Sequence, residues 1–351
     1  MNHTLLVLLA VLVVAIAGVY AIFVRDLTRA RAHLIGCSEI VEQPFGTLEY
    51  AAMGEGEPVL SVHGAGGGFD QALAMTGALA RRGYQIIAPS RFGYLRSSLP
   101  SNLTTAMQAD AYAQLLDSLG IDRAVVVGIS AGAWSSMQFA IRHPERCRAL
   151  VLLVPADYLP AGTSIHGGSV VRAMINSDFV AWVALKLMPV LPGGMTRMLL
   201  GTDGAIVRTA DPTEKVRVQQ VLDHLLPVSS RFGGMQFDMK TAATREPYMI
   251  EKIACPVLTI SAHDDRFGTA GRAKDIAASV PDGRAIIFPT GGHALVGHFA
   301  AILHEITLFL RTHPDVAALA PNVANAKRSN SRLPVRERPP AAVPSSSDSA
   351  S

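Results

Sequence analysis

The sequence predicts an α/β fold: a mostly parallel sheet of about eight strands covered by helices on both faces, with a helical cap inserted and an apolar helix at the N-terminus. Short runs rich in β-branched residues, such as Ala124–Val127, alternate with segments of helical periodicity. Such runs are typical of parallel strands that are buried on both faces. A long stretch after Pro155 lacks these runs and is punctuated by Gly and Pro, which favours an all-helical insertion.

The N-terminal segment from Thr4 to Val24 contains 21 residues and no charge. As a helix it is about 31 Å long, enough to cross the hydrocarbon core of a bilayer. A cleaved signal peptide is the alternative. Because no Lys or Arg precedes the run, and because the run exceeds a usual signal core, we favour an uncleaved single-pass anchor.

The charges that flank this segment predict its orientation. Arg25, Arg29 and Arg31 follow it, whereas only His3 and the terminal amine precede it. By the positive-inside rule, the remainder of the chain is expected on the cytoplasmic side of the membrane.

The remaining elements follow in order along the chain. Alternating apolar residues from Ser38 to Met53, on either side of Gly46, predict an antiparallel hairpin. Further strands are expected over 59–62, 85–88, 124–127, 149–154, 257–260 and 284–288, and helices over 104–119, 133–142 and 294–310.

These elements divide the chain into five parts. We expect a membrane anchor and juxtamembrane segment over 1–30, a first core segment over 37–155, a helical cap over 156–251 and a second core segment over 252–311. Residues 312–351 are rich in Ala, Pro, Ser and Arg and are expected to be disordered, since this composition cannot bury a core.

The pentapeptide Gly128-Ile129-Ser130-Ala131-Gly132 lies between a predicted strand and a predicted helix. A strand, a Gly-x-Ser-x-Gly turn and a helix form a nucleophile elbow, which exposes the serine hydroxyl on a sharp turn. A serine that merely caps a helix is the alternative reading of Ser130. The elbow favours a nucleophile.

A serine nucleophile needs a base and a group that orients the base, and two later loops supply candidates. Asp264 and Asp265 follow the strand predicted over 257–260, and His293 follows the strand predicted over 284–288. His298 competes with His293 but falls in the apolar segment predicted as the last helix, which favours a structural role.

A glycine-rich turn, His63-Gly64-Ala65-Gly66-Gly67-Gly68, follows the strand predicted over 59–62. Its backbone can direct N–H groups toward a developing oxyanion. The expected donors are the amides of Ala65 and Ala131, the second being the residue after the serine. His63 is assigned a packing role.

Together these motifs resemble the α/β-hydrolase family, in its capped form that includes esterases, enol-lactonases and carbon–carbon bond hydrolases. The resemblance runs from about Cys37 to about Arg311. Besides the loops above, it includes Ala88 to Ser97, which resembles the loop that follows the next strand in that family.

The resemblance implies that Ser130 is the nucleophile, His293 the base and an aspartate of the pair the orienting acid, with Asp265 preferred and Asp264 the alternative. This sequence departs from the family pattern twice. Ser90 stands where the family has an aspartate, and Phe267-Gly268-Thr269 replaces the proline usual after the catalytic aspartate. The second departure bears on the choice between Asp264 and Asp265.

The predicted function is that of a membrane-anchored serine hydrolase acting on a carboxylic ester of an apolar small molecule or lipid. The same residues would serve carbon–carbon bond hydrolysis or acyl transfer, and a non-catalytic binding protein of this fold stays open. No cofactor, metal or nucleic-acid partner is expected, because no nucleotide-binding motif, ligand spacing or basic stripe is present. A serine at the elbow argues against epoxide hydrolases and haloalkane dehalogenases.

The predicted cap contains a very apolar segment, from Val170 to Val190, followed by Met195 to Leu200. Two interpretations are open: these residues pack the cap onto the core, or part of this surface lines an acyl site or enters the bilayer interface. Arg231 either contacts a substrate carboxylate or bridges the cap to the core, and a bridge is slightly favoured.

Overall fold

The computed structural model describes residues 3–158, 168–188, 192–244 and 248–314. Most of the predicted C-terminal tail, residues 315–351, lies outside the described residues. Within the described residues one sheet of 8 strands has the order β1-β2-β4-β3-β5-β6-β7-β8. The strands are β1 Glu39–Gln43, β2 Gly46–Met53, β3 Glu57–Val62, β4 Tyr84–Pro89, β5 Ala124–Ile129, β6 Cys147–Leu153, β7 Val257–Ala262 and β8 Gly283–Phe288.

The sheet is antiparallel at one edge and parallel elsewhere. The predicted hairpin forms β1 and β2, and β2 also pairs antiparallel with β4. The pairs from β4 through β3, β5, β6, β7 and β8 are parallel. The predicted mostly parallel α/β sheet is confirmed, and the carboxyl ends of its parallel strands meet along one edge.

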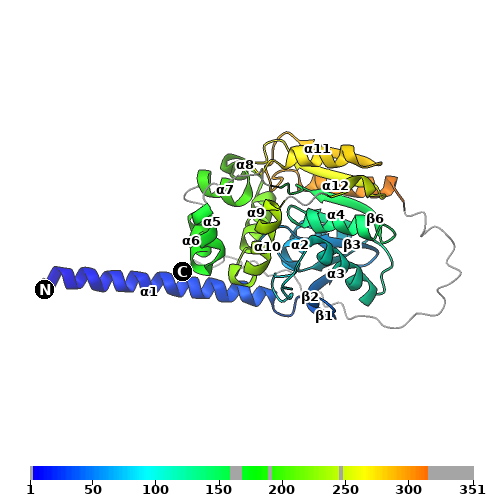
Figure 1. Cartoon of the computed structure of the whole chain (residues 1–351). Helices are drawn as coiled ribbons and strands as arrows, with labels where there is room; N and C mark the ends of the chain where they lie inside the picture. The colour runs from blue at the N-terminus through cyan, green and yellow to red at the C-terminus, as the bar shows by residue number, and fades with distance from the viewer. Residues whose placement is uncertain (1–2, 159–167, 189–191, 245–247, 315–351) are drawn as a thin grey trace, which may run out of the picture. The chain divides into compact units, whose positions relative to one another are not determined.

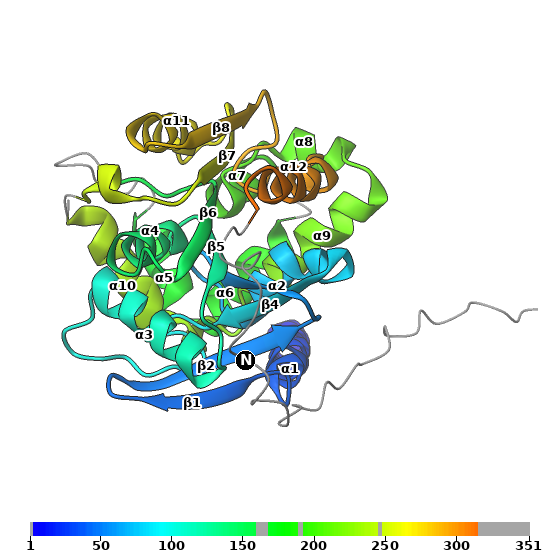
Figure 2. The same ribbon diagram turned by 90° about the vertical axis from the view of Figure 1, so that its right-hand side faces the viewer.

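Helices cover both faces of this sheet, as Figure 2 shows. In β5, Val126 packs on one face with residues of α3, α4 and α11, whereas Val125 and Val127 pack on the other with α12. This alternation has the period of two that strands require. The helices on the two faces are α2 Phe69–Thr76, η1 Gly77–Arg82, α3 Thr105–Ser118, α4 Gly132–Arg142, α11 Thr269–Ser279 and α12 Phe299–Thr312.

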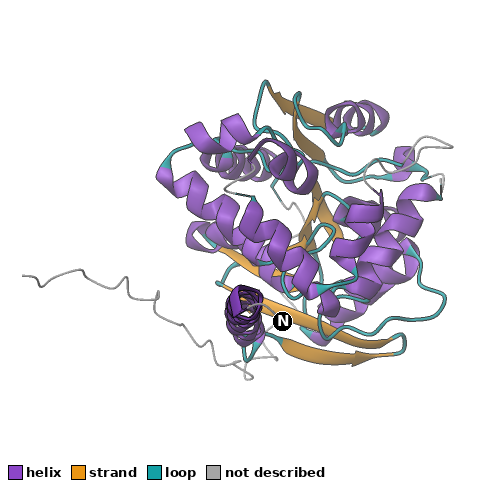
Figure 3. Cartoon of the chain, turned by 90° about the vertical axis from the view of Figure 1, so that its left-hand side faces the viewer, coloured by secondary structure: helices purple, strands orange, loops and turns teal. Residues whose placement is uncertain are grey.

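The regular elements that the structure describes between β6 and β7 are all helices, in agreement with the predicted cap. Figure 1 shows these helices, in green, grouped beside the sheet, and Figure 3 gives the view from the left-hand side of Figure 1. They are α5 Gly168–Ile175, α6 Asp178–Leu187, α7 Pro192–Leu200, α8 Gly204–Thr209, α9 Pro212–Asp223, η2 Val228–Ser230, α10 Phe232–Ala243 and η3 Ile250–Lys252.

The N-terminal helix α1 spans His3–Leu34 and therefore continues beyond the predicted apolar segment. By length and composition its first part can cross a membrane, a property that signal sequences share. The side chains of residues 3–22 are exposed, and the first buried one is Phe23.

The last helix differs from the prediction, because α12 begins at Phe299 rather than at Ala294. Leu295 has φ 50° and Gly297 has φ 83°, and neither value fits a right-handed helix. His298 consequently precedes the helix instead of lying inside it. Its ring stacks on Phe288 with centroids 4.1 Å apart, which agrees with the structural role expected for it.

Candidate active site

Ser130 occupies the sharp turn between β5 and α4, with φ 49°. A positive φ is unusual for a residue with a side chain and marks backbone strain of the kind found at functional sites. The flanking glycines are required for steric reasons. A Cβ atom at Gly128 would lie 2.6 Å from the Ser136 hydroxyl, and one at Gly132 would lie 2.5 Å from the carbonyl oxygen of His63.

The loop after β8 brings His293 to Ser130. The Nε2 atom of His293 lies 3.0 Å from the Ser130 hydroxyl oxygen, and Nδ1 lies 2.8 Å from Oδ2 of Asp265, on the loop after β7. An ionised carboxylate only accepts hydrogen bonds, so Nδ1 carries the proton in the neutral imidazole. Nε2 is then free to accept the serine proton, which is the arrangement a serine nucleophile needs.

The Asp265 carboxylate is held by several donors. Phe267 donates its backbone N–H to Oδ1 at 2.8 Å, and the Thr269 hydroxyl donates to Oδ2. Burial by itself raises the pKa of Asp265, but the hydrogen bond and charge of His293, with the bonds from Thr269 and Phe267, outweigh it and lower the pKa below its usual value. Thr269 belongs to the segment that replaces the family's proline, and its contact with the carboxylate was not predicted.

Asp264 has a different place in the structure. Its Oδ1 accepts the backbone N–H of Gly292 at 2.8 Å, and its Oδ2 accepts that of Gly291 at 3.3 Å. Asp264 therefore braces the loop that carries His293, while Asp265 bonds to the imidazole itself. Neighbouring carboxylates thus hold the same loop through different atoms.

The glycine-rich turn after β3 lies against the elbow. A Cβ atom at Gly64 would approach the Ser130 Cβ to 3.1 Å, so the two backbones are close. In the described residues, the amides of Ala65 and Ala131 donate no hydrogen bond to another protein group. Ala131, at the N-terminus of α4, also places its amide where a helix dipole favours negative charge.

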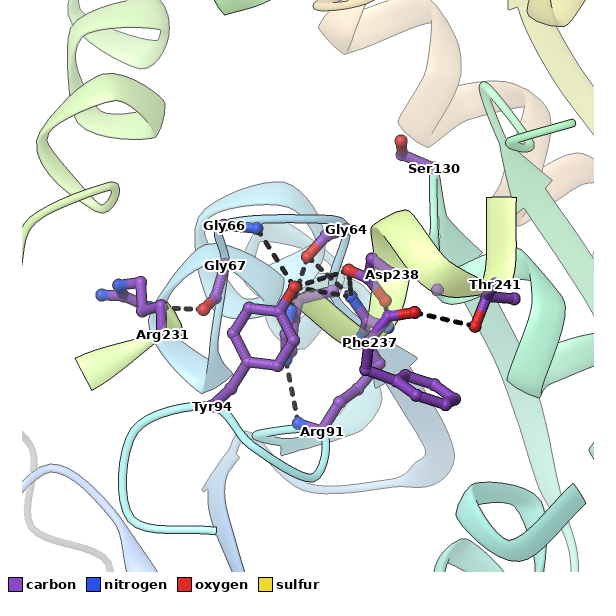
Figure 4. Close-up of polar contacts among 12 residues, drawn as sticks. Gly64, Gly66, Gly67, Arg91, Tyr94, Ser130, Arg231, Phe237, Asp238 and Thr241 are labelled. Atoms are coloured by element: carbon purple, nitrogen blue, oxygen red, sulfur yellow. Dashed lines mark hydrogen bonds and ion pairs between the residues drawn. The ribbon is translucent and has the colours of Figure 1, made fainter. Parts of the chain in front are cut away.

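A buried ion pair joins the cap to the loop after β4, directly beneath this turn (Figure 4). Arg91 donates from both terminal nitrogens to Asp238 of α10, each at 2.6 Å, and Tyr94 donates its hydroxyl proton to Asp238 at 2.5 Å. The same two side chains also bond to the glycine-rich turn. Arg91 donates to the Gly64 carbonyl at 3.1 Å, and the Tyr94 hydroxyl accepts the Gly66 N–H at 3.4 Å. Burial alone lowers the pKa of Arg91, but the Asp238 charge reverses this and raises it.

Arg231, just before α10, forms a second bridge from the cap to the same turn. Its fully buried side chain donates to the Gly67 carbonyl at 2.5 Å and to the Asp70 carboxylate at 2.7 Å. The bridging role that the sequence slightly favoured for Arg231 is confirmed, since these partners occupy its terminal nitrogens.

His63 has the packing role expected for it. Its Nε2 accepts the backbone N–H of Arg91 at 2.9 Å, so Nδ1 carries the proton and donates to the Gly64 carbonyl at 2.7 Å. Burial and the nearby Arg91 charge hold the pKa of His63 well below its usual value. The neutral ring therefore links the glycine-rich turn to the loop after β4.

The cap also contacts the histidine loop, which the sequence did not predict. Thr202, between α7 and α8, is fully buried and accepts the Ala294 N–H at 3.3 Å. The carbonyl of its neighbour Gly201 accepts the Arg266 N–H at 3.0 Å. No motif marks Thr202 or Asp238 in the sequence, because their importance depends on which distant loops they touch.

Within the part of the chain that the structure describes, no group of three or more His, Cys, Asp or Glu side chains could hold a metal ion. The polar groups gathered around Ser130 instead bond to one another or to backbone atoms.

Comparison with known proteins gives the family. A family model described as alpha/beta hydrolase fold matches residues 57–190. The chain is 30% identical over 222 residues to uncharacterized hydrolase YcgS of Bacillus subtilis (strain 168), an alignment that covers 61% of this chain and 76% of that protein. The chain belongs to the α/β-hydrolase family.

Two further likenesses agree with this assignment. The α/β hydrolase is 24% identical over 262 residues to 2-hydroxy-6-oxo-6-phenylhexa-2,4-dienoate hydrolase of Burkholderia cepacia, covering 73% of this chain and 87% of that one. A solved α/β-hydrolase-fold protein from Nakamurella multipartita superposes with a TM-score of 0.63 at 24% identity, covering 79% of this chain and all of that one. The predicted family is confirmed, and the chain is a hydrolase.

Proposed function

We propose that this α/β hydrolase is a serine hydrolase that cleaves a carboxylic ester of an apolar small molecule or lipid. The observation that carries the proposal is the pair of contacts made by one imidazole, 3.0 Å from the Ser130 hydroxyl and 2.8 Å from the Asp265 carboxylate. An isolated serine hydroxyl is a weak nucleophile at neutral pH, and this arrangement is the one that activates it.

In the proposed reaction the Ser130 oxygen attacks the ester carbonyl while His293 takes its proton. Asp265 stabilises the imidazolium, and the amides of Ala65 and Ala131 hold the oxyanion. His293 then gives the proton to the leaving alcohol, which departs and leaves an acyl group on Ser130. Water, deprotonated by His293, attacks this acyl group and releases the acid and the free serine.

The cap supports an apolar substrate. Its helices bring together the buried apolar side chains of Met188, Leu200, Val218 and Leu222 with Val296, which lies three residues beyond His293. In the cap, Thr202 bonds to the histidine loop, and Gly201 bonds to the loop that carries Asp265. The apolar packing of the cap beside the histidine loop therefore supports an apolar substrate.

Covalent labelling tests the nucleophile. We expect a fluorophosphonate probe to label the wild-type protein and to leave Ser130→Ala unlabelled, because an activated serine displaces fluoride from the probe and becomes phosphonylated. In-gel fluorescence measures the labelling, and Ser136→Ala, a change at a buried hydroxyl of α4, is the matched control. An unlabelled wild-type protein would favour the non-catalytic binding role.

Carbon–carbon bond hydrolysis is the second candidate, favoured by the likeness to the Burkholderia cepacia hydrolase. The same nucleophile and base serve both reactions, and acyl transfer as well, because the elbow does not decide the leaving group. Turnover of nitrophenyl esters of graded chain length, measured beside a 2-hydroxy-6-oxo-dienoate, distinguishes these functions. Ester turnover that rises with chain length supports the apolar esterase.

The second part of the proposal is that α1 anchors the enzyme in a membrane, with the catalytic part on the cytoplasmic side. Residues 4–24 are uncharged, and the side chains of this stretch up to Ile22 are exposed to the surroundings of the protein. Exposed apolar side chains in this number are costly in water and favourable in lipid. The cluster Arg25, Arg29 and Arg31 supports the orientation.

Membrane extraction tests the anchor. We expect the full chain to sediment with membranes and to resist alkaline carbonate, because a spanning helix is held by the burial of about 20 apolar residues. Immunoblotting of the pellet and supernatant measures the partition. A soluble chain whose mature N-terminus lies within the apolar segment would show a cleaved signal sequence and contradict the anchor.

A further inference from the structure

The anchor helix is packed against the cap. Phe23 and Leu27 of α1 are buried against Ala181 and Trp182 of α6. The Phe23 ring also meets the edge of Phe179, with centroids 5.2 Å apart. Because the last residue of the uncharged segment is Val24, this contact lies at the end of the stretch proposed to cross the membrane.

Polar contacts fix which way α6 faces. Asp26 accepts the indole N–H of Trp182 at 3.1 Å and pairs with Lys186 at 2.8 Å. Asp178 at the start of α6 pairs with Arg31, farther along α1, at 3.7 Å. These contacts place Asp178 beside Arg31, and place Phe179 and Trp182 beside Phe23, at the end of the uncharged segment of α1.

From Phe179 onward, α6 carries an apolar stripe that is partly exposed. Phe179, Val183 and Leu187 follow one another at intervals of four residues and lie on one face of the helix, with Val180 beside them. Phe179 is 41% exposed, Val180 36% and Leu187 43%, whereas Val183 is half-buried and packs against the cluster that contains Phe23. A stripe of this kind, which begins where Phe179 contacts Phe23, is costly in water.

We propose that this α6 stripe rests on the surface of the bilayer that α1 crosses, so that the cap of the enzyme is held against the membrane. The occupant is a lipid surface, because the stripe continues an apolar helix that the same lipid would surround. The neighbouring Lys186 fits this position: its side chain is 56% exposed and its ammonium pairs with Asp26, so its stem can cover apolar surface while the ammonium stays at the level of the headgroups.

The inference rests on the anchor proposed above and adds a route for the substrate. The cap segment that follows α6 includes α7 and Thr202, which touches the histidine loop. A cap seated on lipid would receive an apolar ester from the bilayer rather than from water. The substrate class is then a lipid-dissolved ester.

A fluorophore on the stripe tests the contact without using catalysis. Cys37 is the exposed cysteine among the three, so a Cys37→Ser chain accepts a single label. Two variants of that full-length chain, Leu187→Cys and Leu308→Cys, are labelled with the same environment-sensitive fluorophore. Each labelled protein is then reconstituted in phosphatidylcholine vesicles. Leu308 is the matched control because its exposure, 41%, is similar to that of Leu187. It lies on α12, which packs beside β7, whereas the end of α1 packs beside β2 in a distant part of the sheet.

Lipids carrying a nitroxide on the acyl chain near the headgroup are expected to quench the label at position 187 by at least half and the label at position 308 hardly at all. Equal quenching at both positions in carbonate-resistant vesicles would overturn the α6 contact while leaving the anchor intact. Loss of the chain from the vesicles under carbonate would overturn both.

Activity gives a second measurement. Leu187→Glu is expected to lower turnover of an ester dissolved in phosphatidylcholine vesicles several-fold and to leave turnover of a water-soluble short-chain ester unchanged. An equal loss on both substrates would indicate damage to the cap and would contradict the membrane contact. If the wild type hydrolyses neither ester, the proposed esterase function is contradicted. The quenching experiment still decides the membrane contact in that case.

Discussion

Replacing Asp265 by Asn is expected to lower kcat for ester hydrolysis by about 10⁴-fold, since the amide can present an N–H to the imidazole and favour the wrong tautomer. His293 Nε2 would then carry the proton and could not accept that of Ser130. The effect should be seen throughout the neutral range. The hydrogen bonds and charge of His293, with the bonds from Thr269 and Phe267, hold the pKa of Asp265 below its usual value, so its carboxylate is ionised over that range. Steady-state kinetics with a nitrophenyl ester measure the loss.

Asp264→Asn is the matched control, one residue away and with the same change in chemistry. It keeps an acceptor for the Gly292 amide and weakens only the longer contact to Gly291, so a loss of less than about tenfold is expected. Thermal unfolding checks that both variants fold. If Asp264→Asn proves the more damaging, Asp264 takes over the orienting role that the sequence left open for it.

The second large effect is expected at Asp238, where replacement by Ala leaves the Arg91 guanidinium buried without its counter-ion. The side chains of this pair are 4% and 5% exposed, and breaking such a pair costs about 3–5 kcal/mol of the free energy of unfolding. The Tyr94 hydroxyl loses its acceptor at the same time. Denaturant unfolding in detergent micelles measures the change.

Asp110→Ala provides the comparison for a more exposed carboxylate, which pairs with Arg142 and His143. Its partner Arg142 is 42% exposed, so the expected loss is about 1 kcal/mol or less. Replacing both Arg91 and Asp238 by Leu should recover part of the lost stability, since no charge is then left unpaired. Equal destabilisation by Asp238→Ala and Asp110→Ala would contradict this account of the cap bridge.

Local sequence determined the positions of most strands and of the turn that carries Ser130. The β-branched runs predict the strands because burial on both faces requires an unbroken apolar segment, and the ends of β3, β5, β7 and β8 agree with those predictions within two residues. The Gly-x-Ser-x-Gly turn was also predictable from the sequence. The turn requires glycine at both flanking positions, because a Cβ atom at either would collide with backbone or side-chain atoms. The last helix was placed too early, because positive φ values at Leu295 and Gly297 leave no trace in hydrophobic periodicity.

Contacts between distant segments were decided only by the tertiary structure. Thr269, Thr202 and Asp238 resemble any surface threonine or aspartate until the fold brings them to Asp265, Ala294 and Arg91. The packing of α1 on α6 is of the same kind: residue pairs such as Phe23 and Trp182 lie far apart along the chain. Periodicity and propensity act over a few residues, whereas a hydrogen bond or ion pair between loops depends on where the whole sheet places their ends.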